Sequence, residues 1–156
     1  IQEKFSLNTS QAKEIAHLSD GNYINAIKLI EHSEVEELYL NQFKKWMRSA
    51  FVADVLGLVN WTEEIASPTF GREKQVHFLN YCLRIFRESL MQNYGDPSLE
   101  RSGESAAQFL QKFAPYIHGA NCIEVIELFN DAIYHIERNA HPKILFLGAK
   151  LAVVLN

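Results

Sequence analysis

The chain has 156 residues, of which 47% are hydrophobic, and it carries a net charge of −4. This length suits one ordinary domain or two small ones, and the hydrophobic content is enough to build a core. A mildly acidic chain lacks the positive charge expected of an independent nucleic-acid-binding protein.

The sequence lacks the signals of secretion and of membrane insertion. No N-terminal stretch combines a basic flank with the apolar run of a signal peptide. No apolar run approaches the roughly 20 residues that span a bilayer. Cys82 and Cys122 lie in apolar segments, and we interpret them as reduced core residues rather than a disulfide pair. We therefore expect a cytoplasmic protein that does not associate with a membrane.

The first third of the chain predicts helices. A short helix from Ser10 to His17 ends at Asp20-Gly21, and a second helix spans Tyr23 to His32. From Glu34 onward, apolar residues recur at helical spacing and predict a long helix that bends or restarts near Gly57 to Trp61.

The rest of the chain continues the helical pattern, and no alternating run supports a sheet. The predicted fold class is therefore all-α, a helical bundle. The predicted elements are a loop at Ser67 to Gly71, a long helix from Arg72 to Tyr94, an exposed loop at Gly95 to Glu104, and helices at Ser105 to Tyr116 and Ile123 to Asn139. The long helix from Arg72 to Tyr94 has one apolar face, formed by Val76, Leu79, Leu83, Phe86 and Leu90.

The composition changes between Ser33 and Glu36. Before this point lie two short helices around a glycine turn, and after it come long helices with the periodicity of a bundle. We therefore predict two parts, residues 1–33 and residues 34–156. The first part is too small to fold alone, which favours the tail of a preceding domain. We expect the two parts to move relative to each other.

A search for catalytic chemistry finds little. The chain has no Gly-rich phosphate loop and no HExxH pair. His118 and Cys122 are four residues apart, but Gly119 between them argues against a shared helical face for a metal. Ser102 and Ser105 lack a placed base. We predict no catalytic residue, no cofactor and no metal site, and a small helical enzyme stays an open alternative.

The C-terminal segment, Arg138 to Asn156, is more informative. One helix ends at Asn139-Ala140, and another starts with Pro142 at its first position. From there to Leu155 the charged residues are Lys143 and Lys150, two turns apart on one stripe. A helix that is apolar nearly all round is buried on almost every side. It is either the central helix of a monomer or a helix that closes against another subunit.

Several segments of the chain resemble the clamp-loader subunits of the AAA+ family. Residues 18–30, LSDGNYINAIKLI, are similar to the glycine turn of the lid domain. Residues 139–156, NAHPKILFLGAKLAVVLN, are similar to the last collar helix. Between them, FKKWMRSAF, WTEEIAS and REKQVHFLNYCLRIFRESL resemble the middle of the delta-prime type of subunit of bacterial DNA polymerase III. The resemblance covers nearly the whole chain, and its specificity comes from the order and spacing of these segments.

The resemblance implies the C-terminal part of such a subunit, without its nucleotide-binding domain. Residues 1–33 would end the AAA+ lid domain, and residues 34–156 would form the collar domain that joins the subunits. The implied role is non-catalytic, in a complex that loads the sliding clamp on primed DNA, with the other clamp-loader subunits as partners. The interface would use Pro142, Lys143, Leu147 and Leu151, with Lys143 and Lys150 on the most exposed line of the helix.

Ile24 separates this chain from the ATPases of the family. In those subunits, the residue three positions after the glycine is an arginine that reaches the terminal phosphates of the nucleotide. An aliphatic side chain cannot form a charge-assisted hydrogen bond to phosphate. Ile24 therefore favours the delta-prime type over the tau or gamma ATPase subunit, which stays an alternative, and we expect no ATP binding. Ile24 could also pack beneath the turn.

An unrelated helical DNA-binding domain is a further alternative. It would need a basic patch, and the sequence offers two modest clusters. The first cluster is Lys44, Lys45 and Arg48, and the second is Arg72 and Lys74. If DNA binding depends on the first cluster, neutralising Lys44 and Lys45 should weaken binding at raised salt.

Overall fold

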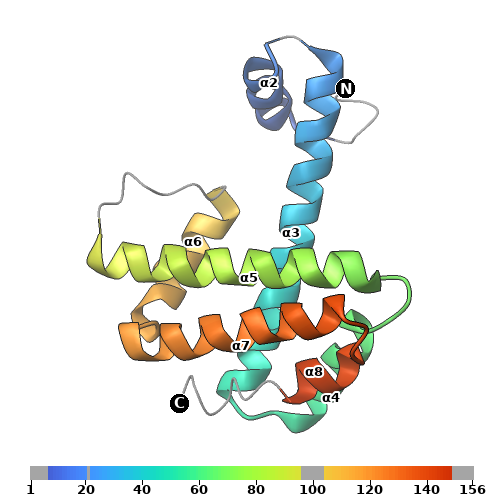
Figure 1. Cartoon of the computed structure of the whole chain (residues 1–156). Helices are drawn as coiled ribbons and strands as arrows, with labels where there is room; N and C mark the ends of the chain where they lie inside the picture. The colour runs from blue at the N-terminus through green and yellow to red at the C-terminus, as the bar shows by residue number, and fades with distance from the viewer. Residues whose placement is uncertain (1–6, 21, 96–103, 149–156) are drawn as a thin grey trace. The chain divides into compact units, whose positions relative to one another are not determined.

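The computed structural model describes residues 7–20, 22–95 and 104–148, and these residues form helices and no strand (Figure 1). The predicted all-α class is confirmed. Most of the predicted loop at 95–104 and residues 149–156 of the predicted terminal helix lie outside the described residues. The helices are α2 (Thr9–Leu18), α3 (Tyr23–Phe51), α4 (Val55–Ile65), α5 (Gly71–Tyr94), α6 (Glu104–Phe113), the 3-10 helix η2 (Ala114–Tyr116), α7 (Gly119–Glu137) and α8 (Pro142–Gly148).

Within the described ranges, no helix has both the length and the apolar character needed to cross a membrane.

The chain divides into two compact units, Ile1–Asn41 and Gln42–Asn156. Helix α3 belongs to both, because it runs without interruption from Tyr23 to Phe51. The prediction of separate helices before and after Ser33 is therefore wrong. The segment between them is rich in glutamate, a good helix former, so the change in composition did not end the helix. The predicted boundary at residues 33–34 lies inside α3, whereas the units divide between residues 41 and 42.

Side-chain caps define the helix starts of the first unit. The backbone N–H of Gln11 donates to the side-chain oxygen of Asn8, and the N–H of Asn8 donates back to the side chain of Gln11. This reciprocal pair satisfies two N–H groups that a helix start leaves unpaired. The predicted first helix is confirmed as α2. At the start of α3, the side-chain oxygen of Asn22 accepts from the N–H of Ile24 at 3.0 Å.

The break after α3 lies earlier in the chain than the sequence predicted. Val52 and Ala53 form a turn, in which Ala53 has a φ of 52°. Asp54 then caps α4 by accepting from the N–H of Gly57 at 3.0 Å. The prediction of a bend or restart near Gly57 to Trp61 is therefore wrong, because both residues lie within α4, where Gly57 is in the first turn and donates its N–H to the capping Asp54.

Helix α5 is the central helix of the second unit. It lies alongside α7 (Figure 1) and also contacts α6 and η2. The predicted apolar face contributes Leu79, Leu83 and Phe86, all of which are buried. Phe78 and Ile85 are buried as well, so α5 packs on more sides than one stripe.

Aromatic rings fill the core of the second unit. The ring of Phe86 contacts those of Phe43, Phe113 and Phe129, with centroids 5.6–5.7 Å apart in edge-on geometry. Edge-on pairs of this kind contribute about 0.5–1.5 kcal/mol each beyond the burial of their area. A second group forms where Trp46 stacks on another tryptophan, Trp61, with centroids 4.6 Å apart and planes 14° apart.

Polar side chains join helix ends within this core. Asn93 Nδ2 donates to the carbonyl oxygens of Ala114 and Ile117, at 2.6 and 2.7 Å. Gln75 Nε2, which is buried, donates to the carbonyl of Ile65 at 2.9 Å. The carbonyls of Ile65 and Ile117 lie at or just beyond the ends of helices, where carbonyl groups lack partners within the helix, and the carbonyl of Ala114 also accepts from the N–H of Ile117. The amides therefore connect α5 to its neighbours.

Cys82 and Cys122 are both free and buried, which confirms their interpretation as reduced core residues. Burial raises the pKa of the Cys82 thiol well above its ordinary value, and it also raises the pKa of Cys122. Since the thiolate is the reactive form, we expect neither thiol to react with an aromatic disulfide reagent in the folded protein. Both should react in denaturant, which absorbance of the released thiolate would measure. Fast labelling of either thiol in the folded protein would contradict this packing.

Candidate interaction surfaces

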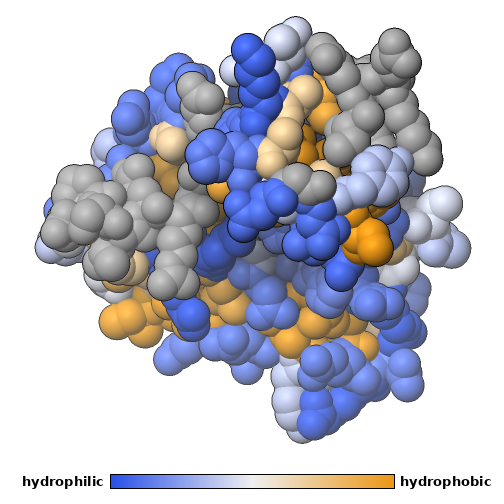
Figure 2. Space-filling model, turned by 90° about the horizontal axis from the view of Figure 1, so that it is seen from above, coloured by the Kyte–Doolittle hydropathy of each residue, from blue (hydrophilic) through white to orange (hydrophobic). Residues whose placement is uncertain are grey.

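Hydrophobic side chains reach the surface at several places. On the face shown in Figure 2, they form separate patches between hydrophilic side chains. Scattered exposed apolar residues are normal for a soluble protein. The informative ones lie beside a pocket or groove. Such places in the second unit include one at α8 and one between α3 and α6.

Helix α8 exposes apolar side chains on one side and is anchored on the other. Ile144 and Leu147 are 70% and 42% exposed, and their spacing of three places them on one side of a helix. Phe146 is buried, and its ring meets Trp46 and Trp61 edge-on at 5.6 and 5.5 Å. Of the other predicted interface residues, Pro142 is half-buried and Leu151 lies outside the described residues.

Lys143 connects α8 to α4. Its Nζ lies 2.7 Å from Glu63 Oε1, and this hydrogen bond and the lysine charge lower the pKa of Glu63. The prediction that Lys143 lies on the most exposed line of the helix is wrong, because Lys143 is half-buried while Ile144 is exposed. Spacing within the helix could not reveal a partner on another helix. Lys150 lies outside the described residues.

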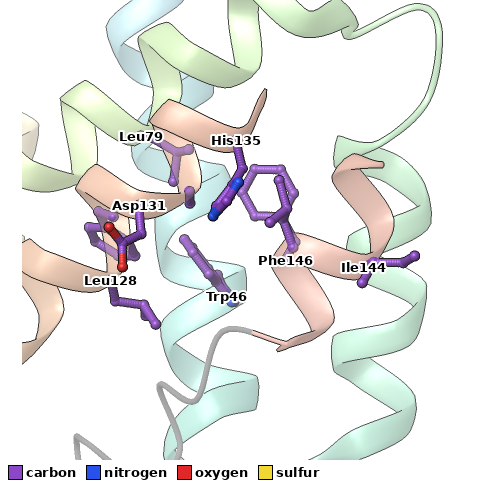
Figure 3. A pocket seen from close by; sticks show the side chains of 10 residues that line it. Trp46, Leu79, Leu128, Asp131, His135, Ile144 and Phe146 are labelled. Carbon is purple, nitrogen blue, oxygen red and sulfur yellow. The ribbon is translucent and has the colours of Figure 1, made fainter. Parts of the chain in front are cut away.

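A pocket of about 200 Å³ opens beside α8 (Figure 3). Phe146 points from α8 toward His135 of α7, whereas Ile144 points away from it. Asp131 and His135 are the ionisable groups among its described lining residues, and both are exposed. The rest of the lining, such as Leu128, is apolar. This lining suits contact with an apolar side chain better than catalysis, which needs a nucleophile or base held in place by a further group.

His118 caps a helix, and Cys122 is buried in the core. His118 caps α7, because its Nδ1 accepts from the N–H of Asn121 at 3.3 Å and its own N–H donates to Asn121 Oδ1 at 2.9 Å. The helix therefore begins at Gly119, earlier than the predicted start at Ile123. In the part of the chain that the structure describes, no three His, Cys, Asp or Glu side chains gather where a metal ion could bind.

A chain of hydrogen bonds joins α3 to α4. Trp61 Nε1 donates to Gln42 Oε1 at 3.0 Å, and Gln42 Nε2 donates to Glu64 Oε1 at 2.7 Å. Lys45 Nζ lies 3.1 Å from Glu64 Oε2. Gln42 is buried, so each of its polar atoms needs the partner it has. No sequence pattern predicts this network, since its members lie on two helices.

The stability that Glu64 contributes should depend on pH. Its pKa is lowered mainly by the hydrogen bond from Gln42, and also by Lys45, against a smaller opposing effect of burial. A lowered pKa in the folded state means that the contribution is present at neutral pH and is lost as the pH falls through that pKa. Because Glu64 is about half exposed, screening keeps the contribution below about 1 kcal/mol.

The measurement compares the free energy of unfolding of the wild type with that of Glu64→Gln over a pH series. The difference should be largest near neutral pH and should shrink in acid. A difference that stays constant across the series would show that the ionised carboxylate has no such role. Glu124→Gln, an exposed position on α7, provides the control.

The basic residues of the possible DNA-binding clusters have separate roles. Lys45 is paired with Glu64, as described above. Arg72 Nη1 donates to the carbonyl of Ile136 at 3.3 Å and to Asn139 Oδ1 at 2.9 Å, which holds the start of α5 to the end of α7. Lys44 and Arg48 lie one turn apart on α3 and line a groove.

Ile24 lies in the first turn of α3 and is 64% exposed. It therefore does not pack beneath the glycine turn, and that alternative is wrong. Leu18 and Tyr23, on either side of the turn, are exposed as well. Gly21 itself lies outside the described residues.

No protein-family model, curated protein or solved structure matches the chain. A functional assignment therefore depends on the residues and on their arrangement.

Proposed function

We propose that the chain is a non-catalytic assembly part of a clamp-loader subunit of the delta-prime type. The observation that carries this proposal is the apolar surface of α8, where Ile144 and Leu147 are exposed on a helix anchored by Phe146. The resemblance of residues 139–156 to the last collar helix supports it. Its partners would be the other loader subunits and, through the complex, the sliding clamp and primed DNA in the cytoplasm.

The surface of α8 has the properties of a subunit interface. The centre of such an interface is apolar and poor in charge. The edge-on contacts of Phe146 and the hydrogen bond between Lys143 and Glu63 hold α8 in place before any partner binds. A surface that is already ordered loses less conformational entropy on association. The pocket beside α8 offers a place for an apolar side chain of the neighbouring subunit.

The test introduces charge at this surface in two variants, Ile144→Asp and Leu147→Asp. Both positions are exposed, so we expect the isolated variants to keep the helical circular dichroism and the unfolding midpoint of the wild type. Association with the other loader subunits should be lost, because a carboxylate would be buried without a partner at the interface. Native mass spectrometry of the mixed subunits measures this.

Ile123→Asp is the matched control, because Ile123 is 61% exposed on α7. It should leave both the fold and the association unchanged. Assembly of Ile144→Asp and Leu147→Asp as tight as that of the wild type would refute the proposal. Unfolding of these two variants, with Ile123→Asp intact, would identify α8 as a core helix of the monomer instead.

A further inference from the structure

A groove of about 370 Å³ lies between the end of α3 and the α6–η2 segment, and we call it the basic groove. The floor of the groove is formed by the aromatic rings of Phe51, Phe109 and Phe113. Phe109 stacks on Phe113 with centroids 5.3 Å apart, and Phe51 meets Tyr116 edge-on at 5.2 Å. These contacts fix the rings, so the floor exists before any ligand binds.

Three cations surround this floor, Lys44 and Arg48 on α3 and Lys112 on α6. Lys44 Nζ lies 5.4 Å from the ring centroid of Phe109, which keeps the ammonium group beside the floor. The described lining residues include no carboxylate, and within the described part of the chain none of the three cations forms an ion pair.

This arrangement differs from the rest of the molecule. The chain has 19 acidic and 15 basic residues, so an average surface region contains as many carboxylates as cations or more. Three like charges gathered around an apolar floor repel one another, and a ligand that supplies negative charge would relieve this repulsion. The rim also exposes apolar side chains, since Val52 and Tyr116 are exposed.

We propose that the basic groove binds a short acidic segment of a partner protein. One bulky apolar side chain of the segment lies on the rings of Phe51 and Phe109, and flanking carboxylates pair with Lys44, Arg48 and Lys112. The charge complementarity selects this ligand, because the floor accepts an apolar group and the rim accepts carboxylates. The groove shares no residue with the described surface of α8, so this inference does not depend on the proposed assembly role.

Single-stranded nucleic acid is a less suitable occupant. Bases stack on exposed ring faces along an extended track of cations. Here Phe113 is buried, and the stack between Phe109 and Phe113 already uses one face of each ring. The cations are gathered at one groove in a chain of net charge −4.

The test selects ligands from a phage-displayed library of random peptides on the folded chain. Peptides that also bind the Lys44→Glu/Lys112→Glu variant are removed. We expect the selected peptides to share one bulky apolar residue flanked by aspartate or glutamate. Fluorescence anisotropy with synthetic copies should show an affinity loss of about tenfold or more in the Lys112→Glu variant, and weaker binding at raised salt.

Two matched pairs of variants locate the site. Val52→Asp should abolish binding, whereas Val55→Asp, at a similarly exposed valine outside the groove, should not. Lys112→Glu should weaken binding, whereas Lys74→Glu on α5 should not. The proposal is wrong if no peptides are enriched, if the enriched peptides are not acidic, or if each pair of variants behaves alike. Binding of oligothymidine that Lys112→Glu abolishes, without peptide binding, would assign the groove to nucleic acid instead.

Discussion

Replacing Phe86 with alanine is expected to lower the free energy of unfolding of the second unit by about 3–5 kcal/mol. The side chain is fully buried in the centre of α5, and its ring contacts three other aromatic rings. Its removal would leave a cavity that these rings, held by their own neighbours, can fill only in part. Denaturant unfolding followed by far-ultraviolet circular dichroism measures the loss.

Two further variants on α5 separate the loss of stability caused by removing a packed ring from the change caused by altering helix propensity. Phe86→Leu keeps most of the apolar volume and should cost clearly less than Phe86→Ala. Tyr94→Ala removes an exposed aromatic side chain near the end of the same helix and should change the stability little. Equal costs at Phe86 and Tyr94 would contradict the placement of the core around α5.

Replacing Phe146 with alanine is expected to detach α8 from the second unit. Phe146 is the buried side chain of this helix that meets both Trp46 and Trp61, whereas Ile144 and Leu147 are exposed. Truncating a buried phenylalanine costs about 3–5 kcal/mol, which the hydrogen bonds within the seven described residues of α8 cannot recover. Local unfolding of α8 is therefore favoured over loss of the whole core.

Hydrogen exchange measured by mass spectrometry distinguishes these outcomes. Amides of α8 should lose protection in Phe146→Ala, while those of α5 and α7 should keep it. The variant should also fail to join the other loader subunits if the proposed function is right. Leu147→Ala, which truncates an exposed neighbour, should leave the exchange of α8 nearly unchanged. Unchanged protection of α8 in Phe146→Ala would show that other contacts hold it.

The sequence predicted the helices well where their apolar spacing was regular. The face of α5 that includes Leu79, Leu83 and Phe86 is buried as the periodicity indicated. The division predicted at Ser33 falls inside α3, whereas the errors at the starts of α4 and α7 concern helix ends, which depend on single hydrogen bonds. Asp54 and His118 cap α4 and α7, and neither belongs to a strong sequence signature. An aspartate before an apolar run is still a known start signal, and it could have placed the break after α3 correctly.

The candidate surfaces were less predictable, because their residues come from distant parts of the chain. The sequence singled out Lys44 and Arg48 as a possible DNA-binding cluster. It could not show that Lys112 on α6 joins them, or that the groove has an aromatic floor. In the same way, the partner of Lys143 is Glu63 on another helix. Only the packing of the helices brings these side chains together.

The stacking of Trp46 on Trp61 also determines what spectroscopy can report. The chain has two tryptophans, and these two indole rings lie 4.6 Å apart in nearly parallel planes. Their electronic transitions should couple and add an exciton band to the far-ultraviolet spectrum, which distorts helix content read from that region. Tryptophan emission, in turn, does not report directly on residues 1–41, because they contain no tryptophan. Melting curves from the two signals would therefore separate if the first unit unfolds on its own.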